Sequence, residues 1–385
     1  MIIENALVYG PDEKFAPGAI VIRDGVFAKD TKENREGVQE VIDAKGAYAI
    51  PGLVDLHFHG AMGADVCDGT RKAFEAIAAY EAGEGITAIC PATLTLPVRD
   101  LEHVLSVGAE FAKTPHEGAD VIGFNMEGPF ISHIKKGAQN EDYILPADAR
   151  LVDRFLEASQ GLLKIIGLAP EENPGFEDYI RDVKNRVIVS IAHSNADYET
   201  ARRAFDAGAS HAVHLYDAMT ELSHRAPGIV GAVSDSPKVN AEIICDGIHV
   251  HPAAVRAAFR MMGKDRMILI SDSLRCTGMP DGRYELGGEP VVKKGKYCTL
   301  VKEGNLAGSV SNLMDCVRNV VKTMEIPLET AVACATIHPA RAICAEDRYG
   351  SIEPGKKGNV VLLSADERLE TRMVIKDGKV IRRKK

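Results

Sequence analysis

The sequence predicts an α/β protein, namely a (β/α)8 barrel of the TIM type with a small β-sandwich domain built from both termini. Two patterns support this prediction. Eight short apolar runs alternate with amphipathic stretches between residues 53 and 272, whereas residues 1–49 and 350–385 show alternating β patterns. We expect the barrel to comprise residues 50–344 and the β domain to comprise residues 1–49 and 345–385.

The eight apolar runs each end in a polar residue. They are residues 53–59, 86–93, 120–127, 163–171, 186–193, 210–216, 239–246 and 266–272. Strands without in/out alternation are buried on both faces, which is typical of a parallel sheet covered by helices. Helical patterns at 71–81, 196–207 and 252–262 lie between them. In such barrels the catalytic groups lie at the carboxyl ends of the strands.

A doubly wound open sheet is the alternative architecture. It would be expected to carry a glycine-rich phosphate-binding fingerprint after the first strand, and no such motif follows residues 53–59. The two chain ends differ from the middle because Asp24-Gly25 and Asp377-Gly378 are hairpin-turn signals. We therefore expect the two ends to fold together beside the barrel.

Composition excludes several classes of protein. The chain has 385 residues, of which 45% are hydrophobic, so it can bury a substantial core. The net charge is −9 and basic residues cluster only at 382–385, which argues against a nucleic-acid partner. The start of the chain lacks a signal-peptide pattern, and no run approaches the roughly 20 apolar residues of a membrane span. The eight cysteines form no CxxC pair, so we expect a reducing, cytoplasmic environment.

Six side chains of metal-binding types stand at the ends of five predicted strands. They are His57, His59, Glu127, His193, His214 and Asp272. Residues two apart in a strand point the same way, so His57 and His59 can reach one metal ion together. Taken singly, an HxH pair arises by chance, a lone glutamate is more often a turn residue, and a lone histidine is more often a hydrogen-bonded core residue. Their joint placement on one rim favours a zinc or iron centre with a position left open for water.

Eleven short segments follow one another along nearly the whole chain. They are PGLVDLHFHG, MEGPF, KKGAQN, LAPE, AHSNA, HLYDAM, HRAPGIVGA, ICDGIHV, ISDSLR, LAGS and GSIEPGK. Together they resemble the successive motifs of the N-acetylglucosamine-6-phosphate deacetylases, a family of metal-dependent amidohydrolases. The resemblance implies hydrolysis of the acetamide of N-acetylglucosamine 6-phosphate to glucosamine 6-phosphate and acetate, in amino-sugar catabolism and recycling.

The resemblance also implies roles for the six rim residues. They would form a centre for a divalent metal, zinc or iron, and because the HxH pair is kept, two ions with Glu127 as the bridge are expected. Asp272 would be both a ligand and the general base and acid. It would accept a proton from metal-activated water and deliver it to the sugar nitrogen.

A second group of residues would bind the substrate. By resemblance, Arg225 would reach across a homodimer interface to the phosphate in the neighbouring site, where its fork of donors suits phosphate geometry. The implied pocket residues are Ala138, Gln139, Asp217, Ala218, Asp246, Gly247, His249, Leu306, Ala307 and Gly308. Three positions depart from the family pattern. Asp217 replaces the usual asparagine and brings a carboxylate near the expected phosphate, Asn125 replaces a common histidine, and Ser273 replaces the usual alanine.

Two other functions are compatible with parts of this pattern. A related amidohydrolase acting on a cyclic amide, a dipeptide or another N-acyl sugar would keep the metal centre and change the pocket. A non-enzymatic scaffold would be expected to have lost ligands, yet all six are present. His133 is left unassigned, and six further histidines are expected to have structural or solvent roles: His103, His116, His211, His224, His251 and His338.

Overall fold

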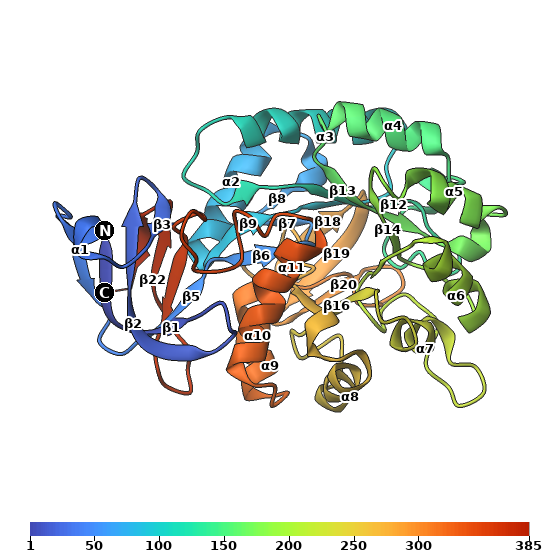
Figure 1. Cartoon of the computed structure of the whole chain (residues 1–385). Coiled ribbons are helices and arrows are strands. Elements are labelled where there is room, and N and C mark those ends of the chain that lie inside the picture. The colour runs from blue at the N-terminus through green and yellow to red at the C-terminus, as the bar shows by residue number, and fades with distance from the viewer. Residues whose placement is uncertain (385) are drawn as a thin grey trace.

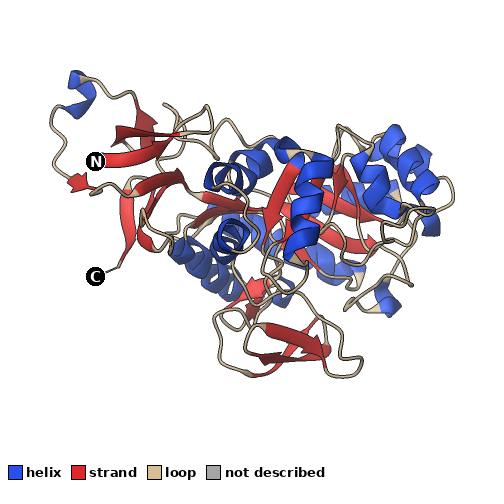
Figure 2. Ribbon diagram, turned by 90° about the horizontal axis from the view of Figure 1, so that it is seen from below, coloured by secondary structure: helices blue, strands red, loops and turns tan. Residues whose placement is uncertain are grey.

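A computed structural model describes residues 1–384 and contains a barrel of parallel strands beside a second sheet made from both ends of the chain (Figure 1). Seen from below, both termini lie in the strand-rich unit at one side, while helices surround the strands of the barrel on the other (Figure 2). The α/β architecture and the pairing of the two chain ends are therefore as expected.

Each of the eight apolar runs contains or overlaps a barrel strand. These strands are β6 (Leu53–Asp55), β9 (Ile86–Ile89), β10 (Ala92–Thr93), β11 (Asp120–Val121), β12 (Phe124–Phe130), β13 (Leu163–Leu168), β14 (Ile188–Ile191), β15 (His211–Ala212), β16 (Asn240–Ile244) and β17 (Met267–Ile270). They pair in parallel in the orders β11-β9-β6 and β10-β12-β13-β14-β15-β16-β17. The Asp272 amide donates to the His57 carbonyl across 3.0 Å, which joins the last strand to the first.

Helices cover the outside of these strands. They are α2 (Arg71–Glu84), α3 (Val98–Lys113), α4 (Ala149–Ala158), α5 (Phe176–Val183), α6 (Tyr198–Ala207), α7 (Gly228–Ser234), α8 (Pro252–Met262), α9 (Leu313–Lys322), α10 (Leu328–Ala335) and α11 (Ile337–Ala342). The three helical patterns expected from the sequence correspond to α2, α6 and α8.

Capping residues explain where the helices begin and end. The Thr70 hydroxyl accepts from the Ala73 amide before α2, and the Asp197 carboxylate accepts from the Thr200 amide before α6. Helix α2 ends at Gly85, whose φ of 96° suits glycine.

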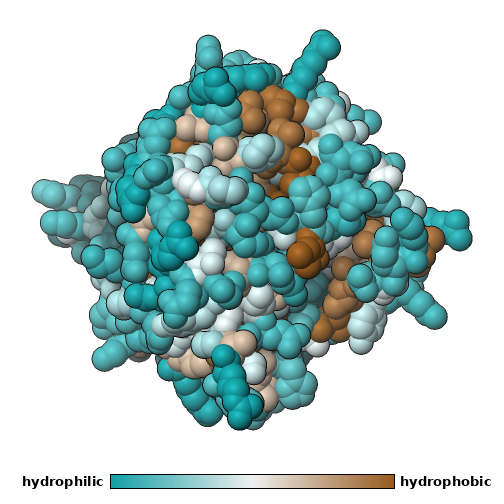
Figure 3. All heavy atoms as spheres, turned by 90° about the vertical axis from the view of Figure 1, so that its right-hand side faces the viewer, coloured by the Kyte–Doolittle hydropathy of each residue, from teal (hydrophilic) through white to brown (hydrophobic). Residues whose placement is uncertain are grey.

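The outer face formed on the α5 to α7 side is largely hydrophilic, with small separate apolar patches (Figure 3). Among residues 1–384, no helix combines the length and the apolar character needed to cross a bilayer.

The two ends of the chain form one eight-stranded sheet. Its members are β1 (Ile2–Tyr9), β2 (Phe15–Arg23), β3 (Val26–Ala28), β4 (Val41–Asp43), β5 (Tyr48–Pro51), β21 (Val360–Leu363), β22 (Thr371–Lys376) and β23 (Lys379–Arg383). Strand β5 runs antiparallel to β21, which joins the N-terminal and C-terminal parts. A short helix, α1 (Lys32–Arg35), follows β3. A separate core from both ends, including Ile22, Ile42 and Ile375, supports this sheet.

Both predicted hairpin turns are present. Asp24-Gly25 connects β2 to β3, and Asp377-Gly378 connects β22 to β23, with positive φ at all four residues. The domain limits at 49/50 and 344/345 remain our proposal. Strand β5 continues the terminal sheet to Pro51, its C-terminal strands begin at Val360, and residue 385 lies outside the described part.

A small antiparallel sheet not anticipated from the sequence follows the last barrel strand. It comprises β18 (Gly282–Leu286), β19 (Glu289–Lys294) and β20 (Tyr297–Leu300), and a second short pair comprises β7 (Gly60–Ala61) and β8 (Ala64–Asp65). Leu286 and Val291 of the small sheet pack with Leu94 and Leu274, which follow barrel strands β10 and β17. The β18–β20 sheet therefore lies against the carboxyl ends of the barrel strands.

Candidate metal centre and active-site cavity

The six rim residues predicted from the sequence converge in the structure. His57 and His59 follow β6, Glu127 lies within β12, and the other three follow β14, β15 and β17. His193, His214 and Asp272 have positive φ values of 44°, 28° and 49°. Left-handed backbone at non-glycine residues is strained and is enriched at functional sites. The fold therefore holds three of the six residues in conformations that they rarely adopt.

Glu127 lies at the middle of the cluster. Its Oε1 atom is 2.9 Å from His193 Nε2, 2.9 Å from His214 Nε2 and 3.2 Å from His57 Nε2. Its Oε2 atom is 3.3 Å from His59 Nε2. One carboxylate thus faces four imidazoles, with one oxygen toward three of them and the other oxygen toward the fourth.

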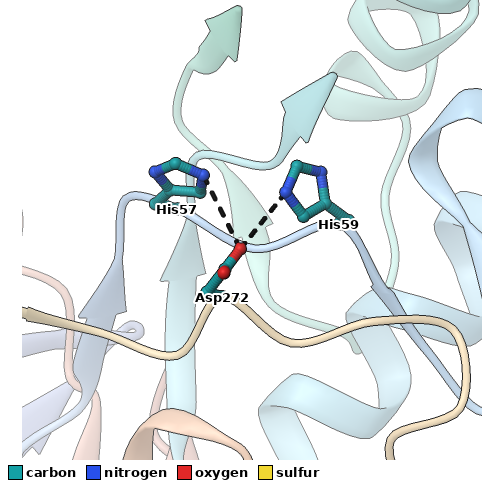
Figure 4. A group of neighbouring side chains, drawn as sticks. All are labelled: His57, His59 and Asp272. Carbon is teal, nitrogen blue, oxygen red and sulfur yellow. Dashed lines mark ion pairs between the residues drawn. The ribbon is translucent and has the colours of Figure 1, made fainter. Parts of the chain in front are cut away.

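Asp272 closes the other side of the cluster. Both histidines of the HxH pair point toward its carboxylate (Figure 4). Its Oδ1 atom is 3.2 Å from His59 Nε2 and 3.8 Å from His57 Nε2. All six side chains are buried, so their polar atoms must be satisfied by one another or by a bound group.

The Nδ1 atom of each imidazole, which points away from Glu127, lies within hydrogen-bond distance of an oxygen. Nδ1 of His59, His193 and His214 lies 3.2, 2.8 and 3.0 Å from the backbone oxygens of Ala92, Lys135 and Asp217, respectively. Nδ1 of His57 lies 2.9 Å from the Glu242 carboxylate. Because these oxygens can only accept, Nδ1 carries the hydrogen and Nε2 faces the cluster, which is the arrangement of metal-ligating histidines.

The donor set fits a divalent metal. Two groups of ligand atoms lie within 4.8 Å of one another, namely His57, His59 and Asp272, and His57, Glu127 and His214. The Nε2 atom of His57 is buried and has no hydrogen-bond partner within the described residues, although Glu127 is close. Imidazole and carboxylate ligands suit zinc and iron, and an orphaned ring nitrogen in such a group is accounted for by a metal.

The electrostatics of the cluster also favour a cation. Burial by itself would raise the pKa of Glu127, but His193 and His57 lower it well below its usual range. Burial would lower the pKa of His59, yet hydrogen bonds to Asp272 and Glu127 raise it to about 10. The two carboxylates therefore hold positive charge in the site, and a metal would replace protons on the ring nitrogens.

A cavity of about 450 Å³ opens above the cluster. It is lined by five of the six rim residues, whereas His57 lies beneath them and is fully buried. Of the predicted substrate residues, eight line it: Ala138, Gln139, Asp217, Ala218, His249, Leu306, Ala307 and Gly308. The cavity is thus lined both by the candidate metal ligands and by most of the residues expected to contact a substrate.

Three predicted substrate residues do not line this cavity. Asp246 is buried, and its carboxylate accepts from Nδ1 of His249 across 2.8 Å, so it orients that imidazole. Gly247 is exposed beside it. Arg225 lies in the exposed segment 221–226, which projects before α7 (Figure 1), and the structure does not bring it to the site of its own chain.

The structure adds residues to the cavity that sequence reasoning missed. Lys135 and Lys136 bring positive charge, and Leu286 arrives from the unanticipated β18–β20 sheet. The lysines could have been found, because they stand at the start of the same KKGAQN segment that contains Ala138. His133, left unassigned, also lines the cavity and lies 3.2 Å from Glu172 through Nδ1.

Two predicted residues have surroundings that their spacing in the sequence could not reveal. Gln139 donates to Glu127 rather than only facing the cavity, with Nε2 2.6 Å from Oε2. Asp217 lines the cavity, and within residues 1–384 its Oδ2 atom has no hydrogen-bond partner. Burial raises the pKa of its carboxyl, although His249 and His214 oppose the shift. A raised pKa weakens the negative charge that Asp217 would present to an anion.

Comparison with known proteins agrees with this arrangement. Residues 48–381 match the model of the amidohydrolase family. This chain belongs to the amidohydrolase family. It is 33% identical over 373 residues to an N-acetylglucosamine-6-phosphate deacetylase of Bacillus subtilis, covering 95% of this chain and 93% of the relative. It is 37% identical over 316 residues to an N-acetylgalactosamine-6-phosphate deacetylase of Escherichia coli O157:H7, covering 82% and 83%.

Solved structures resemble the whole amidohydrolase chain, including the terminal sheet. The crystal structure of N-acetylglucosamine-6-phosphate deacetylase from Pasteurella multocida superposes with a TM-score of 0.89 at 29% identity and covers 98% of both chains. A mutant of the Mycobacterium smegmatis deacetylase, solved in complex with N-acetyl-D-glucosamine-6-phosphate, superposes with a TM-score of 0.89 at 26% identity, covering 99% and 98%. The likeness therefore extends over the barrel and the terminal sheet together.

Proposed function

We propose that this amidohydrolase hydrolyses the acetamide of N-acetylglucosamine 6-phosphate, giving glucosamine 6-phosphate and acetate, within amino-sugar catabolism and recycling. The observation that carries the proposal is the convergence of four Nε2 atoms on Glu127 beside Asp272 at the floor of one cavity. The substrate is inferred from the relatives, whose names give deacetylation of phosphorylated N-acetyl sugars.

The six rim residues are the proposed metal ligands, and zinc or iron is the proposed metal. One ion would be held by His57, His59 and Asp272 and a second by His193 and His214, with Glu127 as a ligand that both would share. This assignment is supported by Glu127, whose Oε2 atom faces His59 and whose Oε1 atom faces His193 and His214. A divalent metal supplies Lewis acidity there, lowering the pKa of water and polarising a carbonyl oxygen.

Asp272 is the proposed proton carrier. An amide resists hydrolysis because water is a weak nucleophile and the amine is a poor leaving group. Asp272 would accept the proton of the attacking water and then deliver it to the sugar nitrogen as the C–N bond breaks. The proposal is supported by the low pKa of this carboxyl, since burial is outweighed by the hydrogen bond from His59 and the charge of His57, so Asp272 is ionised and able to accept.

The cavity supplies groups that suit a phosphorylated sugar. Lys135, Lys136 and His249 bring positive charge to its lining, while Leu94, Leu274 and Leu286 provide apolar surface for an acetyl group or a sugar face. Asp217 is the unfavourable group for an anion, and its raised pKa reduces that repulsion. We propose Ala138, Gln139, Ala218 and the 306–308 segment as the remaining contacts, with Asp246 and Gly247 acting through the position of His249.

Arg225 is proposed to act in a neighbouring subunit of a homodimer. Its own segment, 221–226, is exposed throughout and includes Leu222, a large apolar side chain with 46% exposure. This role is tested by mixing the variants Arg225→Gln and Asp272→Asn, each of which should be inactive alone. Random pairing makes half of the dimers mixed, and one site of each is then intact, so about a quarter of the wild-type activity should return. No recovery after subunit exchange would contradict an intersubunit role.

We also propose that the enzyme works in the reducing cytoplasm. All eight cysteines are unpaired, including Cys276 and Cys298, whose sulfur atoms are 3.8 Å apart. Disulfides are rare in that compartment.

Acetate release tests the proposed reaction. The metal-replete protein is assayed with N-acetylglucosamine 6-phosphate, with the same sugar lacking phosphate, and with N-acetylgalactosamine 6-phosphate. Turnover of the first that exceeds the other two supports the proposal. Faster turnover of the galactosamine isomer would move the substrate to that of the Escherichia coli O157:H7 relative. No release from any of them would contradict the proposed deacetylation.

A further inference from the structure

Glu242 is a fully buried carboxylate that sequence reasoning did not single out. It lies on β16 inside an apolar run and has 0% exposure. Its Oε2 atom is 2.9 Å from His57 Nδ1, and its Oε1 atom is 2.8 Å from His211 Nε2. A lone carboxylate inside a barrel is costly unless it is fully paired, and Glu242 meets that condition by bridging two imidazoles.

His57 differs from the other three candidate histidine ligands in its Nδ1 partner. The Nδ1 partners of His59, His193 and His214 are backbone carbonyl oxygens, which no side-chain substitution removes. His57 alone among these four is held by a side chain and by a charged acceptor. An anionic acceptor fixes the ring tautomer more firmly than a neutral carbonyl does and makes the opposite nitrogen a better donor to a metal.

The contacts of Glu242 prevent it from turning away. His211, on the neighbouring strand β15, occupies the other oxygen. The backbone of His57 is fixed as well, because its amide donates to Asp55 Oδ1 across 3.1 Å while Ser271 donates to Asp55 Oδ2 across 2.6 Å. Both the ring and the main chain of His57 are therefore set by buried carboxylates.

We propose that Glu242 is a positioning residue that presents Nε2 of His57 to the metal, and that it controls the affinity of the position formed by His57, His59 and Asp272. The inference rests on the metal centre of the proposed function. It goes beyond that function by assigning to a residue outside the cavity the control of one metal position rather than both. Loss of a partner that orients a ligating histidine typically weakens metal binding by about 10- to 100-fold.

The test compares Glu242→Gln with Glu81→Gln. Glutamine keeps the shape of Glu242 but presents either a neutral acceptor or an NH2 group to His57. Glu81 is the matched control because it is also fully buried, and both of its oxygens lack hydrogen-bond partners within the described residues. Each protein is loaded with zinc, dialysed against graded concentrations of chelator and analysed for metal per subunit, and the thermal midpoint of the metal-free form is recorded.

The expected result is that Glu242→Gln loses one ion at a chelator concentration about 10- to 100-fold lower than the wild type does, while the second ion is retained. Glu81→Gln should release both ions as the wild type does. Equal retention of both ions by Glu242→Gln would overturn the inference. Loss of both ions together, with a lowered midpoint of the metal-free form, would reduce Glu242 to a structural residue.

Cobalt(II) gives a second readout that needs no substrate. Its visible absorption reports ligand geometry, so the spectrum of Glu242→Gln should differ from that of the wild type, and the spectrum of Glu81→Gln should match it. Wild-type protein that holds metal but releases no acetate would contradict the proposed reaction and leave this inference intact. Wild-type protein that binds no metal would overturn both.

Discussion

Gln139 and Glu127 are joined by a hydrogen bond in which Gln139 Nε2 donates to Glu127 Oε2 across 2.6 Å. The side-chain oxygen of Gln139, Oε1, accepts from the Thr95 backbone amide across 2.7 Å, which fixes the orientation of the Gln139 side-chain amide. The segment that lines the cavity is thereby tied to the carboxylate at the centre of the proposed metal site. Gln139 therefore links the cavity wall to the central carboxylate of the proposed metal site.

Gln139→Leu should lower kcat by about 10- to 100-fold, because a hydrogen bond to a charged group is worth about 1.5 to 3 kcal/mol. Steady-state kinetics on the metal-replete protein check this. Thr95→Ala is the control, since it removes only the hydroxyl while the amide of residue 95 still donates to Gln139. Rates for the leucine variant within a factor of about two of the wild type would show that the bond does not act in the reaction.

Asp272→Asn should lower kcat by about 10²- to 10⁴-fold, which is the usual contribution of a general acid–base group. The two side chains have nearly the same shape, so the fold should not change, but the amide cannot take a proton. Rapid-quench acetate release, with metal content measured on the same samples, separates lost proton transfer from lost metal. A variant that keeps its metal and more than a tenth of the wild-type rate would exclude Asp272 as the base.

Gly60→Ala should destabilise the protein by about 3 kcal/mol, near the upper end for overpacking. A Cβ atom at this buried position would lie 2.2 Å from the backbone oxygen of Ala64, and the neighbouring residue is His59. Gly83→Ala is the control, because its Cβ would meet nothing within 4 Å in helix α2, and it should stabilise by up to about 1 kcal/mol. Urea unfolding of both variants checks the difference. If the two variants were equally stable, the β7–β8 hairpin would have shifted to accommodate the added methyl group.

The sequence allowed the barrel to be predicted because its strands are buried on both faces, so continuous apolar runs and the polar residues that end them mark each strand. His57, Glu127 and Asp272 could be placed on one rim for that reason alone. The resemblance then supplied eight further residues that line the cavity. Residues whose roles depend on partners distant in sequence could not be predicted. Glu242 is an example, because it contacts a histidine 185 residues away.

Local sequence patterns did not predict the β18–β20 sheet or the position of Arg225 relative to the cavity. The β18–β20 sheet was missed, although Gly287-Gly288 lies at one of its turns, because its strands are short and partly exposed. For Arg225 the motif was recognised, but its place relative to the cavity could not be predicted. Its motif matches a family position, but in one chain it lies in an exposed segment away from the cavity, since the site it is proposed to serve is in another subunit.

His249 should make substrate binding and stability depend on pH near 9. Burial by itself would lower the pKa of this imidazole, but the hydrogen bond to Asp246 and the charges of Asp246 and Asp217 raise it to about 9. Below that pH the cationic ring of His249 would attract the phosphate of the proposed substrate. As the pH rises through about 9 the charge is lost, so KM for the phosphorylated sugar should rise while KM for the unphosphorylated sugar should not.

The same shift acts on folding. A histidine whose pKa is raised from 6.5 to about 9 on folding contributes stability that is fully present below pH 6.5 and is lost as the pH rises through about 9, up to roughly 3 kcal/mol. Urea unfolding at a series of pH values between 6 and 10 measures it, with His249→Asn as the comparison. The stability of the wild type relative to this variant should fall across that interval. A constant difference would mean that His249 is neutral in the folded protein and that its contact with Asp246 is a bond between a neutral ring and a carboxylate.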